Sequence, residues 1–347
     1  MKKTTSTTQS TDALNLVSRC PRYQISPLCK LESEGIDIWL KDERTRFGLG
    51  SFKSLGSAYA VIRHIADSLQ ICPSLVNTDI FRHAATHMTF VCASAGNHGL
   101  GVAAASATFG AKARIHLAST VPESYSLRLQ KLGATVLRSG ANYEESMELA
   151  ITDTESTGAI LLADSSWNGY SDVPKLIMEG YTVIAEELRT QFESEGTWPT
   201  HVYLQAGVGS FAAALTTGIR ENWQVQPHIS IVEPVDAACL LTSASVGAIS
   251  SVSGAASIMG MLDCKVPSQV AFEVLKNEAN NFISISDAEA RRAVEKLQRL
   301  GVATTPSGGA GFAAVLKEQK LLDAGRTDFN PLIIVTEADH HTSKSCV

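Results

Sequence analysis

Residues 46–56 have the sequence Arg46-Phe47-Gly48-Leu49-Gly50-Ser51-Phe52-Lys53-Ser54-Leu55-Gly56, in which one lysine stands between apolar neighbours at the start of a predicted helix. Gly48 and Gly50 allow a tight turn and a close approach of the backbone to a ligand. Phe52 and Leu55 provide an apolar wall, which lowers the pKa of an amine because it disfavours the charged form. A neutral amine attacks carbonyl groups, so Lys53 is a candidate for Schiff-base chemistry. A solvated surface lysine is the alternative.

On both sides of this stretch, short runs rich in valine and isoleucine alternate with longer helical patterns. This alternation predicts an α/β fold of parallel sheets wrapped by helices. Four of the predicted strands fall between residues 88 and 168, which is enough for a small domain. We therefore predict a large parallel-sheet domain formed by residues 1–87 and 173–347, and a smaller four-stranded α/β domain formed by residues 88–172. The first dozen residues are expected to lack regular structure.

The composition excludes several classes of function. The chain has 347 residues, of which 44% are hydrophobic and 18% charged, and its formal net charge is -6. A net negative charge without a long lysine and arginine run predicts no binding to nucleic acid or to an anionic membrane surface. The uncharged stretches 197–219 and 237–262 are rich in Gly, Ser, Thr and Ala, so we interpret them as loop and core rather than membrane spans. A small-molecule ligand is expected.

Cysteine usage and the N-terminus predict a cytoplasmic protein. The sequence contains seven cysteines without a C-x-x-C pair, a pattern that suits a reducing compartment. Met1-Lys2-Lys3 is followed by Thr and Ser instead of an apolar segment of signal-peptide length. His340 and His341 stand beside Asp339, but adjacent residues rarely point at one ion, so no metal site is predicted.

Two polar glycine turns each follow a predicted strand and precede a predicted helix. Ser94-Ala95-Gly96-Asn97-His98-Gly99 follows the strand at 88–93, and Gly207-Val208-Gly209-Ser210 follows the strand at 201–205. A strand, a glycine turn and a helix together make a ligand crevice, and a helix N-terminus favours an anion such as phosphate.

The second turn admits two interpretations. Gly207, Gly209 and Ala212 fit the G-x-G-x-x-A form of the dinucleotide fingerprint, and Glu233 lies where the ribose-binding acid is expected. That pattern predicts an NAD-binding oxidoreductase, but it leaves Lys53 and residues 94–99 without a task. Pyridoxal phosphate gives a task to all three segments, because it needs a lysine, a phosphate site and a partner for its ring hydroxyl.

The chain resembles the fold-type II pyridoxal phosphate enzymes, and among them it is most similar to the diaminopropionate ammonia-lyases. The resemblance extends over nearly the whole chain. The motifs that carry it are Lys41-Asp42-Glu43, Arg46-Phe47-Gly48-Leu49, Phe52-Lys53, Gly96-Asn97-His98-Gly99, Trp167, Gly169-Tyr170, Gln205-Ala206-Gly207-Val208-Gly209 and Ile231-Val232-Glu233-Pro234. Each motif alone is weak evidence, whereas their order along the chain is specific.

The resemblance implies pyridoxal 5'-phosphate as the cofactor and a homodimer as the assembly. Lys53 corresponds to the cofactor lysine, Asn97 to the contact of the ring hydroxyl, and Thr336 to the partner of the pyridine nitrogen. The implied cofactor-binding residues are Phe52, Lys53, Asn97, Gly207, Val208, Gly209, Ser210 and Thr336. The implied substrate-binding residues are Ser94, Ala95 and His98, with Ser94 resembling a contact to the substrate carboxylate in the threonine dehydratases.

The implied reaction is α,β-elimination on a small β-substituted amino acid, with 2,3-diaminopropionate as the expected substrate and pyruvate and ammonia as products. Lys53 and Asp164 are the expected catalytic residues. A strand-end aspartate is otherwise a cap or turn residue, but here burial after residues 160–163 is expected to raise its pKa toward a useful value. Ala95 stands where the ammonia-lyases commonly carry an aspartate, so one face of the substrate lacks a base and activity on L-amino acids is predicted.

Further departures from the family's motifs leave alternative functions open. Residues 336–340 match the family's Thr-Glu-Gly-Asp-Thr only in part, and Pro306 replaces an often acidic residue. The turn at residues 94–99, here called the asparagine turn, is similar to that of the threonine dehydratases. The alternatives are a β-replacement synthase, a serine or threonine dehydratase, and a relative that binds the cofactor without catalysis. Cys239 and Cys264 resemble a cysteine pair of the ammonia-lyases and are expected to lie close enough to form a bridge.

Overall fold

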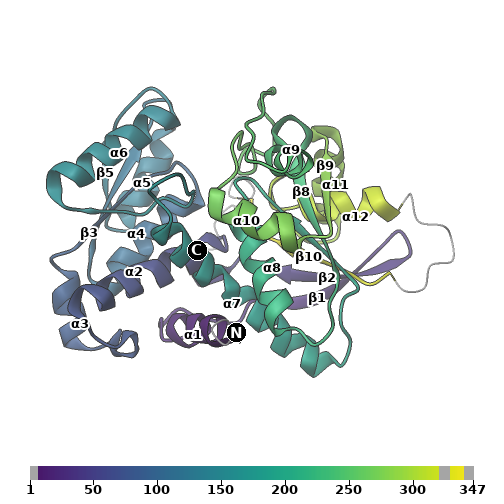
Figure 1. Ribbon diagram of the computed structural model, residues 1–347, viewed down its shortest axis with the longest axis horizontal. Helices are drawn as coiled ribbons and strands as arrows, with labels where there is room; N and C mark the ends of the chain where they lie inside the picture. Colours follow the sequence, from purple (N-terminus) through teal and green to yellow (C-terminus); the bar gives the residue numbers. More distant parts are fainter. Residues whose placement is uncertain (1–6, 320–328, 340–347) are drawn as a thin grey trace.

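The computed structural model describes residues 7–319 and 329–339. These residues form a six-stranded sheet and a four-stranded sheet, which lie in two lobes (Figure 1). The strands are β1 (Leu28–Ser33), β2 (Ile36–Asp42), β3 (Thr89–Ala93), β4 (Lys112–Leu117), β5 (Thr135–Arg138), β6 (Ile160–Leu161), β7 (His201–Gln205), β8 (His228–Pro234), β9 (Asn281–Ile285) and β10 (Pro331–Val335). The α/β fold predicted from the alternating pattern is confirmed.

Helices cover the sheets and connect their strands. The α-helices are α1 (Thr7–Val17), α2 (Lys53–Leu69), α3 (Asp79–Ala85), α4 (Asn97–Phe109), α5 (Glu123–Lys131), α6 (Tyr143–Thr157), α7 (Asp172–Glu195), α8 (Ser210–Asn222), α9 (Cys239–Val246), α10 (Gln269–Glu278), α11 (Asp287–Arg299) and α12 (Ala310–Gln319). Short 3-10 turns occupy η1 (Arg46–Gly48), η2 (Pro73–Leu75) and η3 (Val235–Ala237).

The six-stranded sheet has the order β1-β2-β10-β7-β8-β9, and only the β1–β2 pair is antiparallel. Its central strands β7 and β10 have buried side chains at nearly every position. Parallel strands covered by helices on both faces need such continuous apolar runs. The Val, Ile and Leu content of residues 201–205 and 331–335 therefore identifies the centre of this sheet.

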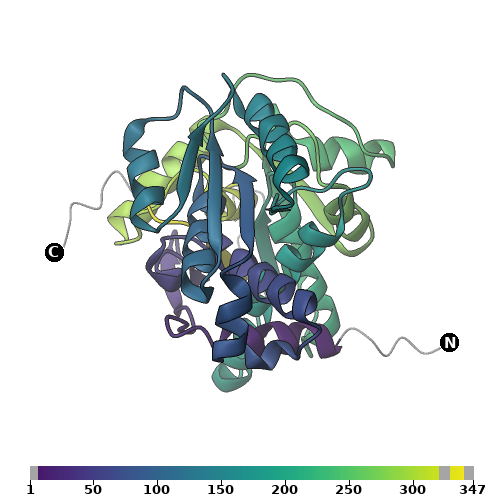
Figure 2. The same ribbon diagram turned by 90° about the vertical axis from the view of Figure 1, so that its left-hand side faces the viewer.

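The four-stranded sheet has the order β5-β4-β3-β6, and all its pairs are parallel. Figure 2 turns this lobe toward the viewer and shows its strands side by side between helices. Phe90, Val91 and Cys92 in β3 are fully buried. β6 pairs with β3 through only two residues, so this strand is shorter than the predicted strand at 159–163.

Helix α2 packs against both α4 and α7. The α2–α7 crossing is close because two glycines meet there. A Cβ atom on Gly180 would lie 2.7 Å from Gly56 Cα. Lys53 stands one turn before Gly56, so this close packing fixes the position of the lysine. The division of the chain at residues 88 and 172 stays a prediction.

Other elements also differ from the sequence-based expectation. Helix α1 begins at Thr7, so the prediction of an irregular start is wrong for residues 7–12; Ala13 and Val17 are buried and α1 packs against α7. The edge strands β1 and β9 were not predicted. None of the helices in residues 7–319 and 329–339 is both long and apolar enough to cross a membrane.

Candidate functional site

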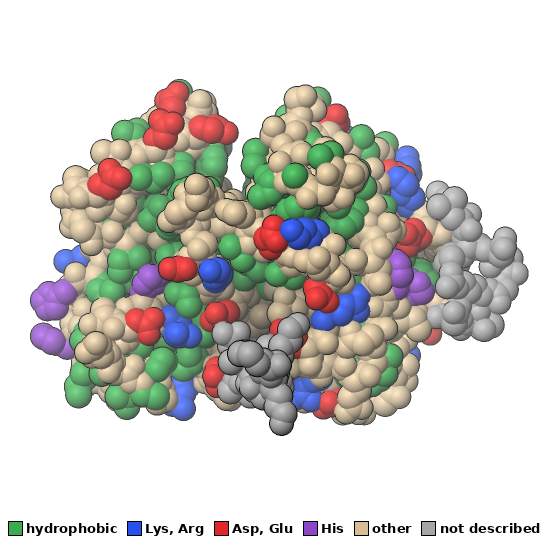
Figure 3. Space-filling model, in the orientation of Figure 1, with side chains coloured by type: hydrophobic (Ala, Val, Ile, Leu, Met, Phe, Trp, Pro, Cys, Tyr) green, Lys and Arg blue, Asp and Glu red, His purple; other side chains and the backbone are tan. Residues whose placement is uncertain are grey.

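The predicted site residues lie after the carboxyl ends of strands from both sheets. Asn97 follows β3, Asp164 follows β6, the turn 207–210 follows β7, and Thr336 follows β10. Ligands of open parallel sheets bind at this edge, because the helix N-termini that follow the strands point there. On the face shown in Figure 3, the surface is notched between the lobe of α5 and α6 and the lobe of α9.

Lys53 and Asp164 form the central contact of the site. The Nζ atom of Lys53 donates a hydrogen bond to Oδ2 of Asp164, and both side chains are about one-quarter exposed or less. The backbone carbonyl of Asp164 accepts a hydrogen bond from Ser210 Oγ at 3.0 Å. The two predicted catalytic residues are thus next to each other, and both lie beside the start of α8.

The charges of this pair change the pKa values in opposite directions. Burial alone would raise the pKa of Asp164, but the charge of Lys53 and the hydrogen bond that Lys53 donates outweigh burial, so this pKa lies below its ordinary value. Burial would likewise lower the pKa of Lys53, but Asp164 outweighs it and the pKa is raised. The expected directions, an amine pKa lowered by its apolar wall and a raised Asp164 pKa, are therefore both wrong, because sequence reasoning did not pair the two residues.

The asparagine turn is held by Ser94. The Oγ atom of Ser94 accepts hydrogen bonds from the N–H groups of Gly96 at 3.2 Å and Gly99 at 3.1 Å. Gly99 is required there, since a Cβ atom would lie 2.7 Å from Ser94 O. Ala95 is exposed at the tip of the turn. Ser94 thus shapes the turn, and its predicted contact with a substrate carboxylate stays a prediction.

His98 is buried beside Asp164. Its Nε2 lies 2.7 Å from Leu162 O, and its Nδ1 lies 4.0 Å from Asp164 Oδ2. Because a carbonyl oxygen only accepts, Nε2 carries the proton in the neutral ring. Burial lowers the pKa of His98, which favours this neutral form. Nδ1 has no hydrogen-bond partner within the described residues.

Asn97 contacts a carboxylate that sequence reasoning did not assign to the site. Its Nδ2 donates to Glu337 Oε2, and the other oxygen of Glu337 accepts from Thr305 Oγ1. Burial raises the pKa of Glu337. Glu337 stands next to Thr336 in the partly matching motif, and that neighbourhood was the only available signal. One of the two Nδ2 protons of Asn97 is left for another acceptor.

The turn at 207–210 approaches its neighbours closely. Gly209 has a φ of 99°, which favours glycine, and a Cβ atom on Gly207 would lie 2.9 Å from Cys264 Sγ. The carbonyl of Val208 accepts from Ser268 N at 2.9 Å. Ser210 begins α8, and the first turn of a helix presents N–H groups without intrahelical acceptors. This geometry suits a phosphate, although it was equally the basis of the dinucleotide interpretation.

Glu233 does not have the ribose-binding position that the dinucleotide interpretation requires. Its oxygens accept hydrogen bonds from the N–H groups of Leu240 at 2.7 Å and Leu241 at 2.8 Å. The carboxylate therefore caps α9 instead of facing a ribose. Burial raises the pKa of Glu233 to about 7, against the lowering effect of the two N–H groups.

Phe52 and Thr336 are brought together at the start of α2. The N–H of Phe52 donates to Thr336 O at 3.3 Å. The ring of Phe52 packs against Phe211 and Tyr181, with centroids 4.4 Å and 4.9 Å away. Tyr181 is another residue that the sequence did not identify, since it lies in the middle of α7; its hydroxyl is buried and has no hydrogen-bond partner among the described residues.

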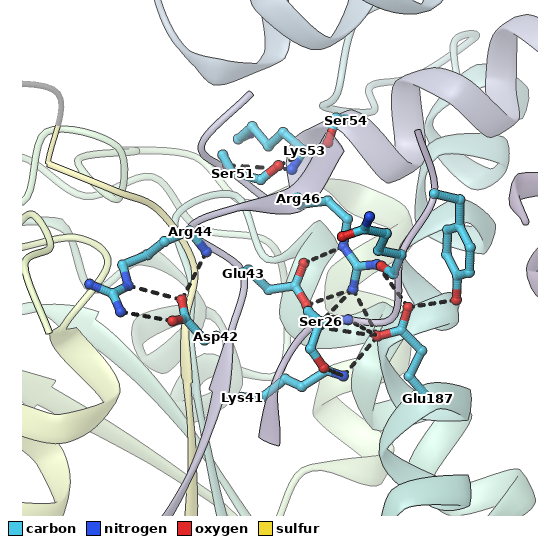
Figure 4. A network of polar contacts seen from close by, with 12 residues as sticks. Ser26, Lys41, Asp42, Glu43, Arg44, Arg46, Ser51, Lys53, Ser54 and Glu187 are labelled. Atoms are coloured by element: carbon cyan, nitrogen blue, oxygen red, sulfur yellow. Dashed lines mark hydrogen bonds and ion pairs between the residues drawn. The ribbon is translucent and has the colours of Figure 1, made fainter. Parts of the chain in front are cut away.

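A buried ion network supports the turn that precedes Lys53 (Figure 4). Arg46 binds Glu43 and Glu187, each at 2.8 Å, and Lys41 binds Glu187 at 2.7 Å. These four side chains are fully buried. The turn has left-handed backbone at Phe47, Gly48 and Gly50. The network therefore holds this strained turn in place, because it links the turn to β2, which precedes it, and to α7, which lies beside it.

Cys239 and Cys264 are free cysteines, so the hypothesised bridge between them is not formed. Both lie at Gly207: Cys239 Sγ contacts Gly207 O at 3.8 Å, and Cys264 Sγ occupies the space of the missing Cβ. Burial raises the pKa of Cys264 to about 11, which disfavours the reactive thiolate. No group of three or more metal-ligating side chains occurs in the part of the chain that the structure describes. Two histidines singled out in the sequence, at 340 and 341, lie outside it.

Comparisons with known proteins agree with this arrangement. The family described as "Pyridoxal-phosphate dependent enzyme" matches residues 21–330. The chain is 34% identical to a diaminopropionate ammonia-lyase of Salmonella typhimurium, over 87% of this chain and 77% of that protein. It is 27% identical to a probable D-serine dehydratase of Sinorhizobium medicae, over 76% of this chain and 63% of that protein.

A solved structure gives the same result for the fold. The crystal structure of diaminopropionate ammonia lyase from Escherichia coli in complex with D-serine is similar with a TM-score of 0.85 and 29% identity. The similarity covers 97% of this chain and 90% of that one.

Independently of these comparisons, the residues of the site fit pyridoxal phosphate. A lysine amine is available beside a carboxylate, and a cradle that Cβ atoms would fill lies at Gly207 and Gly209. Buried polar atoms without partners among the described residues, at His98 and Tyr181, lie close enough to Lys53 and Asp164 to interact electrostatically with them. An aldehyde that also carries a phosphate matches the first two features.

Proposed function

Because the chain belongs to the pyridoxal-phosphate dependent enzymes, we propose that it eliminates the β-amino group of 2,3-diaminopropionate and releases pyruvate and ammonia. The family and the similar lyases make it a pyridoxal phosphate-dependent ammonia-lyase. The choice of diaminopropionate as substrate is our proposal. The observation that carries the proposal is the Lys53–Asp164 pair, which joins a cofactor lysine to an ionised carboxylate.

Pyridoxal phosphate, when bound, withdraws electrons from the substrate α-carbon and so acidifies its proton. The residues around it supply position and proton transfer. Lys53 would hold the cofactor through its aldehyde carbon, residues 207–210 would hold its phosphate, Asn97 would contact the ring hydroxyl, and Thr336 would contact the pyridine nitrogen. Asn97 follows a strand of the four-stranded sheet, whereas the turn 207–210 and Thr336 follow strands of the six-stranded sheet, so the site depends on how the two lobes pack together.

Asp164 accepts the α-proton in this scheme. Its lowered pKa keeps it ionised at neutral pH, which is the form that a base requires. The β-amino group must leave protonated, so the proton taken from the α-carbon can be returned to it by Asp164 or by Lys53. Hydrolysis of the remaining unsaturated amino acid gives pyruvate and a second ammonia, so that one diaminopropionate and one water yield one pyruvate and two ammonia.

We further propose selectivity for the L-enantiomer. Ala95 is exposed at the tip of the asparagine turn and cannot accept a proton, so the side served by an aspartate in similar lyases lacks that base. Ser94 Oγ is engaged by two backbone N–H groups, which limits its use as a substitute. Glu337 is the other carboxylate of the site, and its two oxygens are engaged by Asn97 and Thr305.

The test is an assay of the purified holoprotein with L- and D-diaminopropionate, L-serine and L-threonine, in which the keto acid is measured with a coupled dehydrogenase. Rapid pyruvate formation from L-diaminopropionate, with two ammonia per pyruvate, is expected. Faster turnover of serine or threonine would favour a dehydratase. Adding sulfide or a thiol tests β-replacement, because a synthase would form a new amino acid at the expense of pyruvate.

Assembly and location are also proposals. A homodimer rests on the resemblance to fold-type II enzymes, and light scattering after size-exclusion chromatography tests it. A cytoplasmic location rests on the cysteine pattern, with the six cysteines in the described residues all free. Fractionation of the producing cells tests the location.

A further inference from the structure

Gln205 is a buried residue at the end of β7, where β7, β10 and the loop before α12 meet. Its side-chain Nε2 lies 2.9 Å from Ile334 O, 3.1 Å from Gly308 O and 3.2 Å from Thr336 Oγ1. Only 2% of the residue is exposed. The roles expected for the Gln205–Gly209 motif use its glycines and leave this side chain without a function.

The orientation of the Gln205 amide follows from its neighbours. A backbone carbonyl oxygen can only accept a hydrogen bond, so the atom that faces Ile334 O and Gly308 O must be the NH₂ group. Turning the amide over would place Oε1 against two carbonyl oxygens in a buried environment, which is costly. Oε1 has no partner within the described residues, so it does not oppose this orientation.

This orientation determines the role of the Thr336 hydroxyl. Because Oγ1 of Thr336 faces an N–H group, it accepts a hydrogen bond on that side, and its own O–H points elsewhere. The carbonyl of Thr336 accepts from Phe52 N at 3.3 Å, which places this residue beside the start of α2 and Lys53. The hydroxyl proton is therefore available to a group bound in the site.

We propose that Gln205 is a positioning residue that makes Thr336 a hydrogen-bond donor to the pyridine nitrogen of pyridoxal phosphate. The inference rests on the proposed function, in which Thr336 is the partner of that nitrogen. Without the NH₂ group, the carbonyls of Ile334 and Gly308 lose their donor. The Thr336 hydroxyl belongs to the same cluster, so it turns to these carbonyls and no longer donates to the cofactor.

The test compares the dissociation constants of pyridoxal phosphate and of its 1-deaza analogue, in which a C–H group replaces the pyridine nitrogen. One neutral hydrogen bond should make the wild-type protein bind pyridoxal phosphate roughly 3- to 10-fold more tightly than the analogue. In Gln205→Met and in Thr336→Val, the ratio of the two constants should fall to about one. Gln205→Glu covers the case that the methionine variant does not fold, since a neutral carboxyl group has only one donor and an oxygen that attracts the Thr336 hydroxyl.

A matched control separates this effect from a loss of structure. Gln226 also uses its Nε2 to bind backbone carbonyls, those of Ile219 at 3.1 Å and Trp223 at 2.8 Å, and it is no part of the proposed site. Gln226→Met should keep the wild-type ratio. A wild-type ratio in both Gln205 variants, together with its loss in Thr336→Val, would overturn the inference and leave the proposed function intact. Equal binding of the two compounds by the wild-type protein would overturn the Thr336 contact and the inference together.

Discussion

Lys53, the first residue of α2, is ion-paired with Asp164, which follows β6 of the four-stranded sheet. The pair keeps Asp164 ionised and Lys53 protonated. A protonated amine cannot attack a carbonyl, so Lys53 must give up a proton before it reacts, and Asp164 is the acceptor in contact with it. In the proposed reaction, the same carboxylate is also the acceptor of the substrate α-proton.

The first prediction concerns Asp164. In Asp164→Asn, the amide cannot accept a proton, so kcat with L-diaminopropionate should fall by on the order of 10² to 10⁴. The visible absorbance of the bound cofactor should remain, which separates catalysis from binding. Asp172→Asn is the control, since Asp172, the first residue of α7, is 95% exposed, and this variant should behave as the wild type. Full activity of Asp164→Asn would assign the base to Lys53.

The second prediction concerns the turn at 207–210, the proposed phosphate site. Gly209→Asp adds a negative charge and a Cβ atom at a φ of 99°, so pyridoxal phosphate should bind at least about tenfold more weakly. Gly247→Asp makes the same change at a φ of 80° with no heavy atom within 4 Å of the new Cβ. That variant should bind the cofactor normally in a fluorescence titration. Equal weakening in both variants would mean that general destabilisation, and not the phosphate site, causes the effect.

The third prediction concerns the buried ion network. Arg46→Ala leaves Glu43 and Glu187 without their shared cation, and breaking a buried pair in this way costs about 3–5 kcal/mol of unfolding free energy. Arg44→Ala removes a partly exposed partner of Asp42 and should cost about 0–1 kcal/mol. Urea unfolding measures both. Similar values for the two variants would show that the network is not important for stability.

The fourth prediction concerns pH and Glu233. Burial raises the pKa of this carboxyl from 4.5 to about 7, so between these values the folded state binds a proton that the unfolded state does not. The unfolding free energy should therefore fall as pH rises from 4.5 through 7, by on the order of 2 kcal/mol. Glu233→Gln should lose this dependence, whereas Glu273→Gln, at an exposed position, should keep it. Urea unfolding at pH 5 and pH 8 provides the comparison, and an unchanged slope in Glu233→Gln would assign the dependence to other groups.

The elements that could be predicted from the sequence are those whose pattern of apolar residues reflects their burial. β7 was predicted at residues 201–205 because its buried middle residues, Val202 to Leu204, form a continuous apolar run. β1 is an edge strand that mixes polar and apolar residues and is mostly exposed or half-buried, so a search for continuous apolar runs does not detect it. β9 is a five-residue edge strand between two helices and gives an equally weak signal.

The same distinction applies to the site. Lys53, Asn97 and the turn at 207–210 belong to glycine turns between strands and helices, so local sequence identifies them. Tyr181 lies inside a helix, and Glu337 reaches Asn97 over 240 residues of sequence, so only tertiary packing brings them to the site. The directions of the Lys53 and Asp164 pKa shifts were wrong for this reason, since a charge partner 111 residues away outweighs local burial.

The central claim is that Lys53 carries pyridoxal phosphate, and mass spectrometry of the borohydride-reduced holoprotein tests it most directly. Reduction fixes the cofactor to its lysine, and proteolysis then locates it. One phosphopyridoxyl group per chain is expected on the peptide that contains Lys53, with none in Lys53→Ala and an unchanged amount in Lys112→Ala, where an exposed lysine of β4 is removed. A label on another lysine, or the same label in Lys53→Ala, would contradict the account.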